Sequence, residues 1–112
     1  MLDVHTKIAQ RQAKAPCQHV VISMVLEIVD TDMETLLQRS RKRVLVEKRQ
    51  FMMYALKSIA KLSYQNIGDS LNMNHATVIH GVRNVKQLND VGVQPISNWI
   101  DQLNKRKEGL VA

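Results

Sequence analysis

The chain has 112 residues, which is enough for one domain with a modest hydrophobic core but not for two. Hydrophobic residues make up 45% of it and aromatic residues only 4%, so the core must rest on aliphatic side chains and methionine, which favours packed helices over an aromatic-rich sheet. The net charge of +6 favours an anionic partner, the single cysteine (Cys17) excludes an intrachain disulfide, and no apolar run reaches the roughly 18 residues that span a membrane.

The chain opens with a polar segment of about 15 residues, for which we expect a helical or frayed leader that Pro16 ends. From His19 to Asp30, apolar side chains recur at helical spacing, which predicts a well-buried helix. Its apolar stripe comprises Val21, Met24, Val25 and Ile28 and is broadened by Val20, Ile22 and Leu26. The segment Asp30-Thr31-Asp32 ends this helix and supplies an N-cap for a short helix from Met33 to Leu37.

A basic loop follows, from Gln38 to Arg43. Six of the 16 Lys and Arg residues fall between positions 39 and 49, against one acid, Glu47; the six are Arg39, Arg41, Lys42, Arg43, Lys48 and Arg49. An ordinary solvated surface usually intersperses the two signs of charge. The cluster therefore predicts contacts to phosphate groups, with an ordinary charged surface as the alternative.

The second half of the chain has the pattern of four helices. A long helix is predicted from Val44 to about Lys61, with apolar positions at Phe51, Met52, Ala55, Leu56 and Ile59. Ser63 caps a short helix, Tyr64 to Leu71, with Ile67 and Leu71 facing inward. After a turn at Asn72 and Met73, Asn74 caps a helix that runs to about Leu88, with buried positions at Val78, Ile79, Val82, Val85 and Leu88.

Gly92 marks a break, and Pro95 at a first helical position opens a last helix, Ile96 to Lys107, with Trp99, Ile100 and Leu103 apolar. We interpret Trp99 as a packing anchor, with a partner surface as the alternative. The sequence thus predicts an all-α fold of about six helices. We divide it into a leader (1–18), a central domain (19–90) and a C-terminal helix extension (91–112).

Within this pattern, a short helix, a tight turn and a second helix with small polar residues at its start form a helix-turn-helix, and a basic loop precedes the unit. Residues from about Val20 to Leu88 resemble the C-terminal DNA-binding domain of the bacterial replication initiator DnaA. The resemblance is carried by the helix pair at 25–37, the basic loop, Arg49-Gln50, Ile67-Gly68-Asp69, Arg83 and the heptapeptide Asn74-His75-Ala76-Thr77-Val78-Ile79-His80, which is similar to the family's Asp-His-Thr-Thr-Val-Leu-His. It implies a helix-turn-helix like those of the DnaA C-terminus and the Trp repressor.

The resemblance also implies roles for individual residues. The start of the second helix of the motif would lie in the major groove: Asn74, His75, Ala76 and Thr77. Arg41 would enter the adjacent minor groove from the basic loop, which also carries Arg39, Lys42 and Arg43. Six residues would lie near phosphates: Lys48, Arg49, Gln50, Lys61, Ser63 and Arg83. Small side chains at a helix start allow a close approach to base edges, and a guanidinium suits the narrow minor groove.

Two departures from the family pattern concern the target sequence. Asn74 stands where the family has an acid, which can accept a hydrogen bond from cytosine N4, whereas asparagine can bond to adenine N6 and N7. Ala76 replaces a threonine, although its methyl group can still contact a thymine methyl. The turn before Asn74 also looks one residue shorter and lacks the family's glycines. These changes leave the fold and DNA binding as the expectation and put the target site in question.

Catalysis is not predicted. The four glycines do not form a phosphate-binding loop, so we expect no ATPase activity from this chain, and no cofactor. No catalytic constellation is present in the sequence, and the histidines lack the spacing of a metal site.

The predicted function is sequence-specific binding to double-stranded DNA at DnaA-box-like sites, in replication initiation or its regulation. Alternatives are a transcription regulator of a phage or mobile element, a transposase or repressor domain, or a protein-interaction adaptor that uses the Trp99 helix to recruit replication or transcription proteins. We expect a monomer that is cytoplasmic and associated with the nucleoid.

Overall fold

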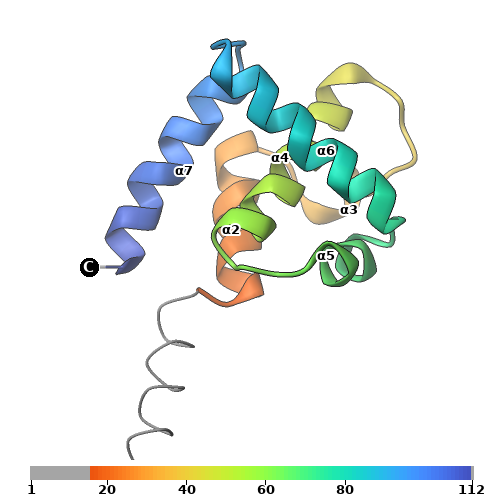
Figure 1. Cartoon of the computed structure of the whole chain (residues 1–112), viewed down its shortest axis with the longest axis horizontal. Coiled ribbons are helices and arrows are strands. Elements are labelled where there is room, and N and C mark those ends of the chain that lie inside the picture. The colour runs from red at the N-terminus through yellow and green to blue at the C-terminus, as the bar shows by residue number, and fades with distance from the viewer. Residues whose placement is uncertain (1–15, 112) are drawn as a thin grey trace, which may run out of the picture.

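The computed structural model describes residues 16–111, so the first 15 residues of the predicted leader (1–18) lie outside them, and Gln18 already belongs to the first helix described. Within this range the chain forms helices and no strand, which confirms the all-α prediction (Figure 1). The helices are α2 (Gln18–Val29), α3 (Met33–Leu36), α4 (Arg43–Ser58), α5 (Tyr64–Leu71), α6 (His75–Asp90) and α7 (Ile96–Val111).

Helix α4 is the centre of the fold, because α2, α3, α5, α6 and α7 all pack against it. Its inward face is fully buried at Phe51, Met52, Ala55 and Leu56, as the 3.6-residue period predicts. The facing helices contribute aliphatic side chains at helical spacing, among them Val21 and Val25 from α2 and Val78, Val82 and Val85 from α6. Each helix thus removes its apolar stripe from water against α4, and burial of this area is the main force that holds the fold.

Five predicted core positions lie nearer the surface than the sequence indicated. Val20 is 38% exposed, and four others are only partly buried: Ile22, Leu26, Ile79 and Leu88. All five flank the fully buried positions of their helices. A hydrophobic residue at the edge of a stripe is therefore a weaker predictor of burial than one at its centre.

Trp99 lies in the core with 8% of its surface exposed, and its ring centroid is 5.6 Å from that of Phe51 in α4. The packing-anchor prediction is therefore confirmed.

Helix α7 folds back along α2 and α6, and Arg106 pairs with Glu27 of α2. The helix begins at Ile96, one residue after Pro95, and continues past the predicted end at Lys107 to Val111. Gly92, with φ of 73°, lies in the turn that reverses the chain between α6 and α7.

The predicted end of α4 was also wrong. The helix ends at Ser58 rather than near Lys61, and Lys61 has the left-handed φ of 60°. Left-handed residues commonly terminate helices, but they are usually glycine or asparagine. A lysine in this conformation gives no signal in the sequence, so the predicted helix ran on.

Candidate nucleic-acid interface

The helix-turn-helix unit is α5, the turn at residues 72–74, and α6. Ser63 caps α5, its hydroxyl accepting a hydrogen bond from the Asn66 backbone N–H at 3.1 Å, and Asn72 ends it in the left-handed conformation. Ile67 and Leu71 of α5 are buried, so the short helix is held by its apolar face. The predicted caps and bounds of α5 are therefore confirmed.

Gly68 allows the turn to lie close to α5. A methyl group built on its Cα would lie 2.5 Å from the backbone oxygen of Met73 and 3.6 Å from the backbone nitrogen of His75. In addition, the Met73 N–H donates to the carbonyl of Gly68 at 2.8 Å. The angle at which α6 leaves the turn therefore depends on this residue having no side chain.

The first turn of α6 presents a polar surface to solvent. Asn74, His75, Ala76 and Thr77 are all exposed, and Asn74 caps the helix by accepting a hydrogen bond from the Ala76 N–H at 2.8 Å. The exposed stripe continues at helical spacing through His80, Arg83 and Gln87, opposite the buried valines. Helix α6 thus has one apolar face fixed to α4 and one face that an elongated ligand can contact along its length.

The basic loop is fixed at its base by Arg49 of α4. The guanidinium of Arg49 donates to the carbonyl of Ser40 and, at 3.4 Å, to the carbonyl of Leu45, while the Ser40 hydroxyl accepts from the Lys42 N–H at 3.2 Å. Arg39, Arg41 and Lys42 remain exposed. The sequence predicted a phosphate contact for Arg49. In the structure Arg49 also holds the basic loop in place through these hydrogen bonds, a role that the spacing of residues did not indicate.

The loop and α6 lie side by side, on the right of Figure 1. Arg41 and Arg43 line a shallow groove of about 320 Å³ together with Asn84 and Leu88 of α6. Nearer the start of α6, Arg49 and Thr77 line a smaller hollow of about 190 Å³ with apolar walls, which include Val46 and Met73. Val46 and Gln50 line both hollows, so Arg41, Arg49 and Thr77 lie on one continuous surface.

Other predicted contact residues are held by neighbours. The Lys48 amine donates to the Thr31 hydroxyl at 2.6 Å, at the turn between α2 and α3, and Arg43 pairs with Glu47 at 3.0 Å. Gln50 accepts a hydrogen bond from the Asn84 side-chain amide at 2.7 Å, which ties α4 to α6. Asn84 was not predicted from the sequence, because its partner lies 34 residues away.

Lys61, Ser63 and Arg83 are exposed. Lys61 and Ser63 lie in the α4–α5 connection and Arg83 lies on α6, and their predicted roles at phosphate remain predictions.

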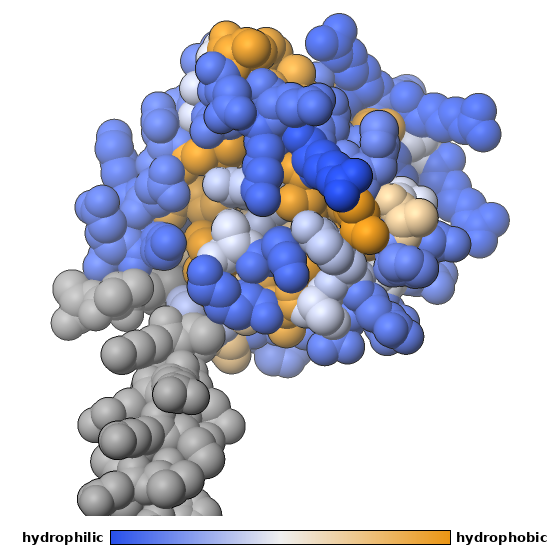
Figure 2. Space-filling view, viewed as in Figure 1, coloured by the Kyte–Doolittle hydropathy of each residue, from blue (hydrophilic) through white to orange (hydrophobic). Residues whose placement is uncertain are grey.

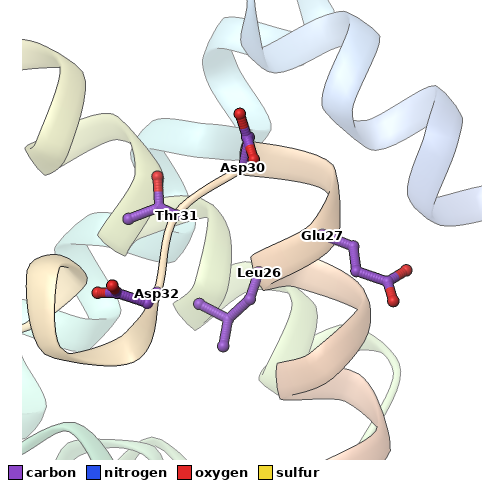
Figure 3. A pocket seen from close by; sticks show the side chains of 5 residues that line it. All are labelled: Leu26, Glu27, Asp30, Thr31 and Asp32. Carbon is purple, nitrogen blue, oxygen red and sulfur yellow. The ribbon is translucent and has the colours of Figure 1, made fainter.

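An acidic hollow of about 560 Å³ contrasts with the basic surface. It is lined by Leu26, Glu27, Asp30, Thr31 and Asp32 at the α2–α3 junction (Figure 3). The Asp32 carboxylate caps α3 by accepting from the Thr35 N–H at 2.7 Å, and this hydrogen bond lowers the pKa of Asp32. Glu27 is paired with Arg106, and the carboxylates of Asp30 and Asp32 make this part of the surface less favourable for a phosphate backbone than the basic loop.

Hydrophilic side chains cover most of the molecular face seen in Figure 2. None of the helices in the described part is long and apolar enough to cross a membrane. Among residues 16–111, no three histidine, cysteine or acidic side chains are arranged to hold a metal ion.

Comparison with known proteins identifies one family. The model of the bacterial DnaA protein helix-turn-helix matches residues 19–85. The chromosomal replication initiator protein DnaA of Flavobacterium psychrophilum is 29% identical over 94% of this chain and 23% of its own length. DnaA of Bacteroides thetaiotaomicron is 32% identical over 89% of this chain and 22% of its own length. DnaA 2 of Chlamydia caviae is 33% identical over 76% of this chain and 18% of its own length. The chain thus spans about a fifth of the length of these curated relatives.

Proposed function

This chain belongs to the bacterial DnaA helix-turn-helix family, and we propose that it binds double-stranded DNA at specific, DnaA-box-like sites in replication initiation or its regulation. The relatives are named chromosomal replication initiators, which supports the biological process. The proposal assigns no ATPase activity to this chain.

The observation that carries the proposal is the single surface formed by the basic loop and α6. Arg41 lines a groove with Asn84 of α6, and Arg49 lines a hollow with Thr77 at the helix start. The start of α6 would enter the major groove with Asn74, His75, Ala76 and Thr77 facing base edges. The adjacent loop would then reach the neighbouring minor groove with Arg41, while Arg39 and Lys42 lie along the backbone.

Phosphate contacts would fix the register of the helix in the groove. Lys61, Ser63 and Arg83 are exposed around the helix-turn-helix, and the free N–H groups at the start of α6 also favour an anion. Arg49 would serve mainly by holding the loop, and Arg43 by forming the loop's edge beside Glu47. We leave Lys48 outside the interface, since its amine is bound to Thr31.

The adaptor alternative gains no support from Trp99, because this side chain is buried against Phe51. A partner of α7 would have to contact the exposed face of the helix, which includes Lys105 and Lys107. A regulator of a phage or mobile element would use the same DNA-binding surface, and it differs only in where the target sites lie.

The test is fluorescence anisotropy with two labelled duplexes, one carrying a TTATCCACA-type DnaA box and one with that sequence scrambled. We expect preferential binding to the box. Arg41→Ala should remove roughly 1–3 kcal/mol of discrimination, whereas Lys105→Ala, on the exposed face of α7, should leave it unchanged. Equal affinity of the unmodified chain for both duplexes, or equal losses on both duplexes for Arg41→Ala, would contradict sequence-specific binding through this surface.

A further inference from the structure

The N-cap of α6 determines which end of the Asn74 amide is available to a ligand. The donor in the capping hydrogen bond is the Ala76 backbone N–H, so the side-chain atom 2.8 Å away must be the acceptor, Oδ1. If Nδ2 stood there instead, its N–H groups would face the Ala76 N–H, donor against donor. Because Asn74 is exposed, its remaining polar group, the NH2, is left for a base edge.

An acid at the same position would present the opposite polarity. One carboxylate oxygen would accept from the backbone N–H, and the other oxygen would again be an acceptor. The change from acid to amide leaves the cap intact but converts the outward group from acceptor to donor. The family pattern has an acid here, so this chain departs from it in the chemistry presented to the DNA and keeps the structure of the helix start.

Base edges in the major groove respond to this difference. Cytosine presents only the N4 amino donor, whereas guanine presents the O6 and N7 acceptors and thymine presents O4. An NH2 group meets an acceptor on guanine or thymine and a second donor on cytosine. Adenine presents N7 as an acceptor beside its N6 amino donor. The two-bond contact to adenine would require both Oδ1 and Nδ2, and Oδ1 already accepts the capping bond, so the NH2 could make only the single bond to N7, next to an opposing donor.

We propose that Asn74 is a specificity-determining residue that selects guanine or thymine, and rejects cytosine, at the base it faces. The proposal rests on the proposed function, since it assumes that the start of α6 enters the major groove. This chain and the variant Asn74→Asp should therefore recognise sites that differ at one base pair.

The experiment is selection from a pool of duplexes with a randomised centre, using the whole chain and two variants, followed by sequencing. Asn74→Asp keeps the cap and inverts the outward group, and Asn74→Ser keeps the cap and removes the outward group. We expect the unmodified chain to enrich guanine or thymine at one position, Asn74→Asp to enrich cytosine or adenine there, and Asn74→Ser to lose the preference at that position alone. Lys105→Ala is the control and should return the motif of the unmodified chain.

Competition between duplexes that differ only at that base pair then measures the effect. The unmodified chain should bind the cytosine duplex roughly tenfold more weakly than the guanine or thymine duplex, and Asn74→Asp should reverse the order. An enriched motif that is the same for the unmodified chain and Asn74→Asp would overturn this inference and leave DNA binding standing. Absence of any enriched motif for the unmodified chain would overturn the proposed function together with it.

Discussion

At the scale of single residues, one side chain often determines both a local structure and what the protein can bind. Asn74 is a cap and also the first residue of the proposed major-groove surface, and Arg49 is a phosphate candidate that also holds a loop. These double roles arise because polar groups at helix ends must be satisfied, and the same ends are where a ligand can approach. Substitutions should therefore be chosen to keep one role while they remove the other.

Asp32 offers a prediction on pH. Its carboxylate accepts from the Thr35 N–H, so its pKa in the folded chain is lower than in the unfolded chain. The cap therefore contributes to stability above the unfolded pKa, and this contribution is lost as the pH falls through the folded pKa.

Asp32→Ala should have a lower melting temperature than the unmodified chain at neutral pH. The difference should shrink at acidic pH, as followed by circular dichroism. Asp32→Asn keeps a cap that does not titrate, so the difference in melting temperature between Asp32→Asn and Asp32→Ala should persist in acid. If this difference shrank in acid together with that between the unmodified chain and Asp32→Ala, the loss would not come from titration of Asp32.

Arg49 offers a second prediction. If its guanidinium positions the basic loop, the effects of Arg49→Ala and Arg41→Ala on DNA affinity should not add, because the first variant already displaces the loop that carries Arg41. A double-mutant cycle should give a coupling of about 0.5–3 kcal/mol. Independent losses would instead mean that Arg49 acts at phosphate by itself. Arg83→Ala, on α6, serves as the control and should combine additively with Arg41→Ala.

At the scale of elements, helix starts were predicted better than helix ends. Ser63 and Asn74 are residues whose side chains cap helices, and both predicted caps are present. The end of α4 was wrong by about three residues because Lys61, in the left-handed conformation, is a residue type that seldom marks a helix end. The sequence therefore fixes an element end only where a residue with strong local preference stands at it.

Gly68 is the residue on which the geometry of the motif depends, and Gly68→Ala should destabilise the fold by roughly 1–3 kcal/mol, because its methyl group would overlap the backbone oxygen of Met73. It should also weaken DNA binding of the folded protein, since the start of α6 must move. Urea unfolding and anisotropy measure the two effects. Gly109→Ala is the matched control: nothing lies near its added methyl group in α7, and it should be neutral or stabilising by up to about 1 kcal/mol.

At the scale of the whole molecule, the hydrophobic core and the exposed polar stripe lie on opposite faces of α6. Burial of valines on one side fixes the helix, and the exposed stripe on the other is left for a ligand. Stability and binding should therefore be separable, except at residues such as Gly68 that set the position of α6.

Trp99→Ala tests this separation. Loss of a buried indole against Phe51 should cost about 3–5 kcal/mol of the free energy of unfolding, a large part of the roughly 5–15 kcal/mol expected for a domain. DNA affinity should be nearly unchanged at temperatures where the variant is still folded. Trp99→Phe keeps a ring against Phe51 and should lose less stability. A specific loss of DNA binding by folded Trp99→Ala would mean that α7 takes part in the interface.

Salt dependence tests the electrostatic part of the interface. Each phosphate neutralised releases counterions, so the logarithm of the binding constant should fall linearly with the logarithm of salt concentration. Lys42→Ala should make the slope shallower by about 0.9, because Lys42 is exposed in the loop. Lys48→Ala should leave the slope unchanged, since its amine is engaged with Thr31. The reverse result would place Lys48 rather than Lys42 at the DNA.

The sequence by itself determined the all-α class, the order of the helices, their buried faces and the caps, because helical periodicity and capping depend on neighbours only a few residues away. It also indicated which segments would contact DNA. Tertiary structure alone decided that Arg49 holds the basic loop, that Lys48 is bound to Thr31 and that Gln50 joins Asn84 of α6. These pairs are set by how α4 packs against other elements, and a linear pattern carries no information on which polar side chains that packing brings together.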